Sequence, residues 1–166
     1  MIRNSLFKTK VRHGYTLYEV LVVTGIIILI GLVAGLSLFG RRNQTDLETA
    51  AKSMTALLRE AQSKAVAQAG GTAWGLHFEN SNPPYYALFS GSAYASTSSV
   101  GYYRLPATLI YATSTLAAGT SRDVVFNQLD GTTAATTFIL YLASNPERSA
   151  TLSIGVLGTV TYTLSF

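Results

Sequence analysis

Apolar residues follow three different patterns along this chain. From Val20 to Phe39 the sequence VLVVTGIIILIGLVAGLSLF runs for 20 residues without a charge. As an α-helix this stretch spans about 30 Å, the thickness of the hydrocarbon core of a bilayer. A helix that is apolar on every side cannot be solvated, so this segment must lie in lipid or against other helices.

Beyond Phe39 the pattern becomes amphipathic. Apolar residues recur at helical spacing at Leu47, Ala50, Ala51, Met54, Leu57, Leu58, Ala61 and Ala65. No proline occurs before Pro83, so the pattern predicts one continuous helix over about residues 15–69 that ends at Gly70-Gly71. We expect the second half of this helix to bury its apolar stripe.

The rest of the chain is typical of β structure. Its short segments are rich in Val, Ile, Thr, Tyr and Phe and are separated by turn sequences. The expected strands are 72–79, 85–90, 100–104, 108–112, 123–127, 136–143, 150–156 and 159–165, with turns at 82–84, 130–131, 145–146 and 157–158. The small polar stretch 90–99 is expected to be a mobile loop. Together the patterns predict an α+β fold, in which one long N-terminal helix packs on a C-terminal antiparallel β domain.

The charges are unevenly placed. The chain has 12 Lys and Arg against 8 Asp and Glu, a formal net charge of +4. Four of the basic residues, Arg3, Lys8, Lys10 and Arg12, lie in the first 14 residues, and the remaining eight balance the eight acidic residues. The basic excess therefore belongs to a leader, where it indicates the cytoplasmic side of a membrane and not a phosphate-binding surface. The lack of cysteine excludes disulfides, thiol chemistry and cysteine-based metal sites.

The sequence indicates no enzyme, no cofactor and no metal site. His77 lies in an expected strand without convergent acidic groups, so we expect a structural role for it. Asp123, Asp130 and Glu147 flank expected turns, where carboxylates accept turn hydrogen bonds or face solvent. Phosphate-cradle and G-x-S-x-G patterns are missing from the sequence. Trp74 is expected to pack beneath the end of the helix.

The motif GYTLYE at residues 14–19 follows the basic leader and opens the apolar helix. In this position it resembles the N-terminal signal of type IV pilins and type II secretion pseudopilins. The resemblance implies that a membrane prepilin peptidase cuts after Gly14 and that Tyr15 becomes N-methylated. Glu19 would then be the fifth mature residue, which in this family pairs with the N-terminus of a neighbouring subunit during filament assembly. The chain departs from the usual pattern at Tyr15, at Tyr18 and in having histidine before the glycine.

The C-terminal half resembles the globular domain of GspH/FimT-type minor pseudopilins. The resemblance lies in the order of the segments RDVVFNQLDG (122–131), TTFILYLAS (136–144) and RSATLSIGVLGTVTY (148–162). Gly158 stands where that family has a glycine near the turn of its terminal hairpin. The resemblance therefore implies a minor subunit.

The resemblance also implies how the chain is divided and where it works. Its parts would be a cleaved leader at 1–14, a transmembrane or filament-core helix at 15–40, an amphipathic helix at 41–70 and a β-rich globular domain at 71–166. Its partners would be the prepilin peptidase and N-methyltransferase, other pilins or pseudopilins, and the inner-membrane assembly platform. It would be a single-pass protein of the cytoplasmic membrane with its globular domain outside, and part of a pilus or pseudopilus after assembly.

Three alternatives stay open at this point. A secretory signal would be cut near residues 33–35, and a plain membrane anchor would explain the apolar stretch without using Gly14 and Glu19. A DNA-binding minor pilin would need clustered Lys or Arg. The segment after residue 71 carries three basic residues, Arg104, Arg122 and Arg148, so we expect no nucleic-acid partner.

Overall fold

A computed structural model describes residues 15–165, with the side chains of all of these except 34–43. The expected leader, including Gly14, lies outside the described residues. The chain divides into two compact units, one up to Gly40 and one from Arg41 onward.

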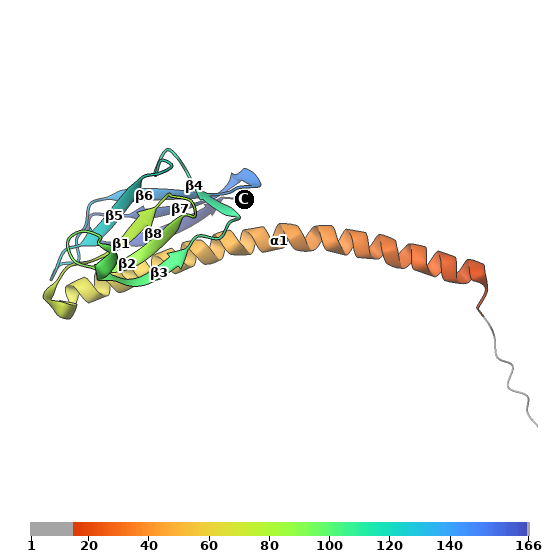
Figure 1. Ribbon diagram of the computed structural model, residues 1–166, viewed down its shortest axis with the longest axis horizontal. Coiled ribbons are helices and arrows are strands. Elements are labelled where there is room, and N and C mark those ends of the chain that lie inside the picture. The colour runs from red at the N-terminus through yellow and green to blue at the C-terminus, as the bar shows by residue number, and fades with distance from the viewer. Residues whose placement is uncertain (1–14, 166) are drawn as a thin grey trace, which may run out of the picture. The chain divides into compact units, whose positions relative to one another are not determined.

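One α-helix, two short 3-10 helices and eight strands make up the regular structure of the described residues (Figure 1). In chain order the elements are α1 (Leu17–Val66), η1 (Ala69–Gly71), β1 (Trp74–Glu79), β2 (Tyr85–Ser90), η2 (Ser96–Ser98), β3 (Ser99–Arg104), β4 (Leu109–Tyr111), β5 (Ser121–Phe126), β6 (Thr136–Leu142), β7 (Asn145–Ile154) and β8 (Val160–Ser165). The strands pair antiparallel in two sheets, with the orders β3-β2-β1-β5 and β4-β6-β7-β8. The predicted α+β fold, one long N-terminal helix with antiparallel β structure, is confirmed.

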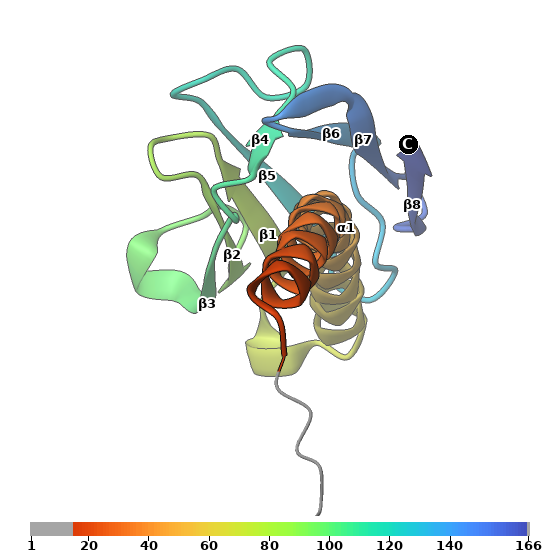
Figure 2. The same ribbon diagram turned by 90° about the vertical axis from the view of Figure 1, so that its right-hand side faces the viewer.

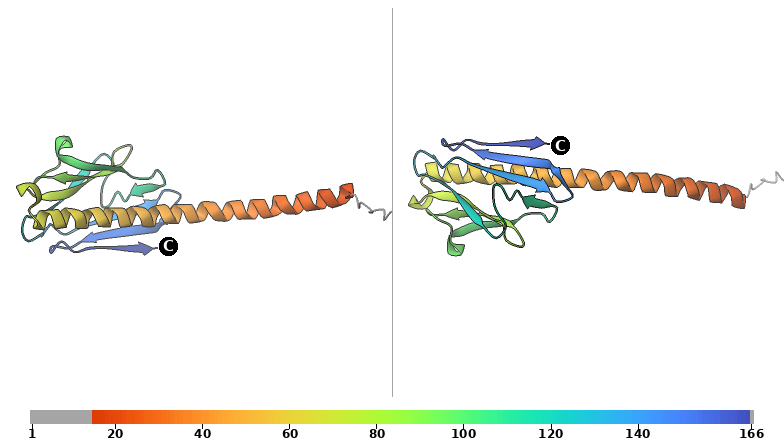
Figure 3. Two further views of the ribbon diagram at one scale, coloured as in Figure 1. Left: turned by 90° about the horizontal axis from the view of Figure 1, so that it is seen from below. Right: turned by 90° about the horizontal axis from the view of Figure 1, so that it is seen from above.

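The second half of α1 packs against both sheets, as the end-on and side views show (Figures 2 and 3). All eight apolar positions predicted from helical spacing are buried, each at most 9% exposed. Side chains such as Leu58 from the helix, Phe78 from β1 and Phe138 from β6 join in one core cluster. The rings of Phe78 and Phe138 stack at 4.1 Å, which ties the two sheets together. The stripe therefore positions both sheets around one helix.

The helix ends earlier than predicted. It stops at Val66, and Gln68 takes a left-handed backbone conformation with φ 52° before η1. Nε1 of Trp74 donates to the carbonyl of Ala69 at 2.8 Å, and Nζ of Lys64 lies 4.5 Å from the centre of the indole. These contacts turn the chain back beneath the helix end. The expected place of Trp74 is confirmed, whereas the expected helix end at residue 69 is wrong.

The strands lie within two residues of their predicted bounds, except at β7. This strand begins at Asn145, and the turn before it lies at residues 143–144 instead of at Asn145-Pro146. Asn145 pairs with Leu142 beyond a register shift, and its Oδ1 accepts a hydrogen bond from the backbone of Glu147 at 3.1 Å. This hydrogen bond stabilises the start of β7 at Asn145. Composition alone does not show whether Asn145 belongs to the turn or to the strand.

Within the part of the chain that the structure describes, no helix is long and apolar enough to cross a membrane. The uncharged stretch 20–39 continues past residue 33, and the side chains beyond that point lie outside the described ones.

Candidate functional site

The first turn of α1 is closed by a side-chain cap. The hydroxyl of Thr16 accepts a hydrogen bond from the backbone N–H of Glu19 at 3.2 Å, and the carbonyl of Thr16 accepts from Val20 at the same distance. Thr16 is therefore the N-cap, and Glu19 occupies the third helical position, the two places of a capping box. The T-x-x-E spacing was readable in the sequence, but sequence analysis missed this second role of Glu19.

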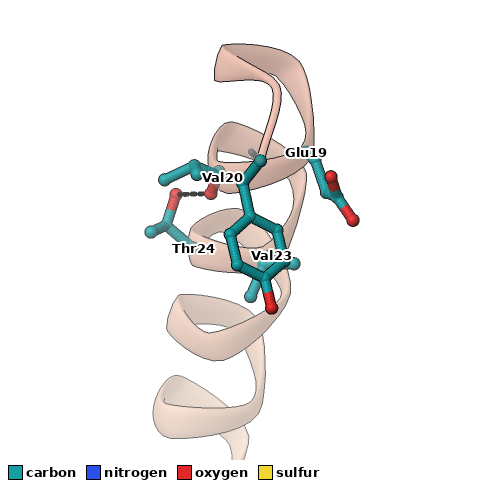
Figure 4. A pocket seen from close by; sticks show the side chains of 5 residues that line it. Glu19, Val20, Val23 and Thr24 are labelled. Carbon is teal, nitrogen blue, oxygen red and sulfur yellow. Dashed lines mark hydrogen bonds between the residues drawn. The ribbon is translucent and has the colours of Figure 1, made fainter. Parts of the chain in front are cut away.

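The position of Glu19 favours a negatively charged side chain. It is the acidic residue of the first turn, where the helix dipole favours a negative charge. In Figure 4 its carboxylate and the side chain of Thr24 point to opposite sides of the helix. A shallow depression of about 430 Å³ on the helix surface is lined by Tyr15, Glu19, Val20, Val23 and Thr24. The site offers a carboxylate beside an apolar wall.

The first half of α1 is uncovered over its described length. Residues 15–33 are all exposed. The exposed Val, Leu and Ile side chains are Leu17, Val20, Leu21, Val22, Val23, Ile26, Ile27, Ile28, Leu29, Ile30, Leu32 and Val33. Consecutive apolar residues from Ile26 to Ile30 leave no polar face for water.

The few polar and small residues of this half suit apolar surroundings. The hydroxyl of Thr24 donates within the helix to the carbonyls of Val20 and Leu21, at 2.9 and 3.0 Å, so it needs no outside partner. A Cβ added at Gly25 or Gly31 would meet nothing within 4 Å, so both glycines lie on open surface. Small residues on such a surface let a second helix approach closely.

The residues predicted for processing and assembly lie at this end of the chain. Gly14 is outside the described residues, while Tyr15 is 82% exposed just before the helix. Tyr15 and Glu19 share one depression. Cleavage after Gly14, methylation of Tyr15 and the pairing of Glu19 stay predictions.

A second polar site lies in the β-rich part of the chain at residues 71–165, hereafter the β unit, and sequence analysis missed it. His77 and Asp123 are cross-strand partners on β1 and β5, and Nδ1 of His77 lies 2.6 Å from Oδ1 of Asp123. Oε2 of Glu79 lies 3.4 Å from Nε2 of the same ring. The expectation that His77 lacks acidic neighbours is wrong, and so is the expectation that Asp123 serves a turn. Strand order brings these residues together, and no local pattern contains it.

The three arginines of the β unit do not form one basic surface. Arg104 lies on β3 and Arg122 on β5, the opposite edges of one sheet, and Arg148 lies on β7 of the other sheet. Three strand spacings, about 14 Å, separate the two edges. The guanidinium of Arg122 lies 6.0 Å from the centre of the Phe138 ring, an orientation toward the core. This arrangement does not favour the binding of a phosphate backbone.

Fold and site together define an α+β protein whose N-terminal helix is buried by its β unit along one half and uncovered along the described part of the other. Among solved structures, the chain is similar to the type IV minor pilin FimU of Pseudomonas aeruginosa strain PAO1. The identity is 21%, the match covers 70% of this chain and 92% of that chain, and the TM-score is 0.48. No protein-family model and no curated protein matches the chain. At this level of similarity, no residue role passes from FimU to this chain.

Proposed function

We propose that this chain is a structural subunit, a minor pilin or pseudopilin, of a type IV pilus or a type II secretion pseudopilus. The uncovered apolar half of α1 carries the proposal. Burying a Val, Leu or Ile side chain contributes ~1.5–3 kcal/mol, so the twelve exposed ones represent roughly 20–35 kcal/mol. This exceeds the ~5–15 kcal/mol by which folded domains are stable. The helix therefore requires a cover of lipid or of other helices.

In the proposed function, lipid covers the helix before assembly and helices of other subunits cover it afterwards. Before assembly, the helix at 15–40 lies in the cytoplasmic membrane, with the leader inside and the β unit outside. After assembly, helices of other pilins or pseudopilins replace the lipid. Lipid tails are as apolar as these side chains, so the exchange has little hydrophobic driving force, and close packing and polar pairing decide the geometry. The open surfaces at Gly25 and Gly31 favour such packing.

Glu19 supplies the polar pair. Cleavage after Gly14 by a prepilin peptidase leaves an α-ammonium on Tyr15, and N-methylation keeps its charge. A cation at the N-terminus of a helix is disfavoured by the helix dipole, and a carboxylate compensates it. Glu19 lies in the first turn and beside an apolar wall, and in this proposal it pairs with the ammonium of a neighbouring subunit. In this proposal the pair fixes the axial register of the filament.

Mass spectrometry of the mature N-terminus tests the processing. The chain is expressed with and without a prepilin peptidase that also methylates. We expect a species that begins at N-methyl-Tyr15 when the peptidase is present, and the intact chain when it is absent. An intact leader in both samples would favour a plain anchor. A cut near residues 33–35 would indicate a secreted domain, and either result would overturn the proposal.

The assembly role of Glu19 is tested by Glu19→Gln. The substitution leaves the neighbour's α-ammonium unpaired among apolar helices, at a cost near the ~2.5–3.5 kcal/mol of a buried charge. We expect incorporation into filaments to fall about a hundredfold, measured by immunoblot of sheared filaments. Glu48→Gln is the matched control, because it removes a partly exposed carboxylate that pairs with Lys52 in the other unit. Equal incorporation of both variants would refute the role of Glu19.

A further inference from the structure

His77 is a buried histidine on the outward side of its sheet. Its neighbours Leu76 and Phe78 belong to the core under α1, so alternation places His77 and Glu79 on the opposite face of β1. His77 is nevertheless 5% exposed, because the ring of Tyr94 stacks on the imidazole with centroids 3.8 Å apart. The loop expected to be mobile thus places Tyr94 over this histidine. Within the described residues, Nε2 of the buried ring makes no hydrogen bond.

The contacts of Asp123 determine which nitrogen is free. Its Oδ1 lies 2.6 Å from Nδ1 of His77, and its Oδ2 accepts the backbone N–H of Tyr94 at 2.9 Å. An ionised carboxylate only accepts hydrogen bonds, so Nδ1 carries the proton. In the neutral imidazole, Nε2 then has a lone pair directed away from Asp123. Asp123 holds the Nδ1 edge of the ring and Tyr94 covers one face, so the Nε2 edge has a lone pair available for a ligand.

The space beside this edge is polar and weakly acidic. A cavity of about 470 Å³ is lined by His77, Glu79, Tyr85, Tyr94, Ser121, Arg122 and Asp123. The lining includes two carboxylates and one arginine, and the guanidinium of that arginine lies against the ring of Phe138. A cation is therefore the ligand that the charges favour.

We propose that Nε2 of His77 and the carboxylate of Glu79 bind a divalent transition-metal ion of the Zn²⁺ type. Nitrogen and oxygen ligands at ~2.0–2.1 Å from a tetrahedral zinc ion lie about 3.4 Å from each other. The observed separation of Nε2 and Oε2 is 3.4 Å, which matches this spacing. Imidazole selects zinc, copper or nickel over magnesium and calcium.

Asp123 completes the arrangement as the residue that orients the ligand. Histidines that bind metal ions usually donate their other ring N–H to a carboxylate, which fixes the tautomer and raises the basicity of the ligand nitrogen. The contact of Nδ1 with Asp123 has this form. Within the described residues, no group of three or more His, Asp or Glu side chains could hold an ion. Water in the cavity therefore fills the remaining positions, and the ion is exchangeable.

Calorimetric titration of the full chain in detergent tests the site. After removal of metal ions, we expect one Zn²⁺ per chain and no binding of Mg²⁺. Glu79→Gln removes a ligand on a partly exposed side chain and should weaken Zn²⁺ binding at least tenfold. Asp123→Asn should weaken it 10–100-fold, the usual effect of losing a carboxylate behind a ligating histidine. His13→Ala is the matched control, because His13 is the other histidine of the chain, and it should leave binding unchanged.

A second readout separates ligation from a structural role. In ¹⁵N NMR of the two histidine rings, Zn²⁺ should shift Nε2 of His77 strongly and leave Nδ1 protonated. A role in folding alone would not produce this difference. The proposal is overturned if millimolar Zn²⁺ gives no binding, if Glu79→Gln binds as tightly as the unaltered chain, or if His13→Ala abolishes binding. Each of these results would leave His77 as a buried ion-pair partner of Asp123 and Glu79.

Discussion

Replacing Gly158 by alanine tests how the end of α1 is held against the last hairpin. Gly158 has φ 74° in the turn between β7 and β8, and a Cβ there would meet Nε2 of Gln62 and the carbonyl oxygen of Gly131. Nε2 of Gln62 donates to the carbonyls of Gly131 and Leu157, at 3.4 and 3.3 Å. The added methyl group would displace Gln62 and weaken both hydrogen bonds.

The cost has two parts that a second glycine separates. A left-handed backbone costs an alanine about 1–2 kcal/mol. Two hydrogen bonds contribute about 1–3 kcal/mol together. Gly119 has φ 73°, but a Cβ there would meet nothing within 4 Å, so Gly119→Ala bears the first cost alone. At roughly 3–4 °C per kcal/mol, we expect Gly158→Ala to lower Tm by about 10 °C and Gly119→Ala by about 5 °C.

The thermal unfolding of these variants is best followed by the fluorescence of Trp74. It is the one tryptophan of the chain, and it packs against the core beneath the helix end. The far-ultraviolet signal would be dominated in detergent by the apolar half of α1, which does not depend on the β unit for its hydrogen bonds. Equal decreases of Tm in the two variants would refute the steric clash at Gly158 and the role of Gln62 in holding α1 against the last hairpin.

The hydroxyl of Tyr111 is buried without a hydrogen-bond partner in the described residues, and burial raises the pKa of Tyr111 far above its usual value. We expect Tyr111→Phe to raise the free energy of unfolding by about 1 kcal/mol in urea titrations, while Tyr86→Phe gives no gain; a loss in Tyr111→Phe would contradict this. Burial, followed by a hydrogen bond with Tyr94, raises the pKa of Tyr85 from 10.0 to about 12. Because the folded pKa lies above the unfolded one, this contribution to stability is complete below pH 10 and is lost as the pH rises toward 12. Tyr85→Phe should flatten the fall in stability over that interval, and an unchanged slope would show that other groups cause it.

Local patterns in the sequence were enough for the helix and for most strand bounds. The buried stripe from Leu47 to Ala65 was predicted residue by residue, because helical periodicity depends on neighbours three and four positions apart. β2 was predicted with its observed bounds, because β-forming residues fill it and a turn sequence precedes it. The end of α1 and the start of β7 were misplaced. The end of α1 depends on the hydrogen bond from Trp74 to Ala69, and the start of β7 depends on the pairing of Asn145 with Leu142 beyond a register shift.

The two candidate sites differ in how far the sequence revealed them. Tyr15 and Glu19 lie in one short motif, so their proximity follows from their closeness in the sequence, although the cap by Thr16 went unnoticed. His77 and Asp123 are 46 residues apart and meet only because β5 pairs with β1, although β2, β3 and β4 lie between them in the sequence. Strand order depends on which side chains fill the core together, and no local pattern encodes it.

The sequence by itself determined that the first half of the helix needs a cover, because an apolar run without a polar face loses too much free energy in water. It also determined that the single carboxylate of the first turn, Glu19, directly precedes that run. Only the tertiary structure decided that the same helix is covered by two sheets in its second half, and that a histidine is sealed against two carboxylates on the outer side of one of them. The reason is physical: periodicity is a property of adjacent residues, whereas burial and charge pairing arise when distant strands share one core.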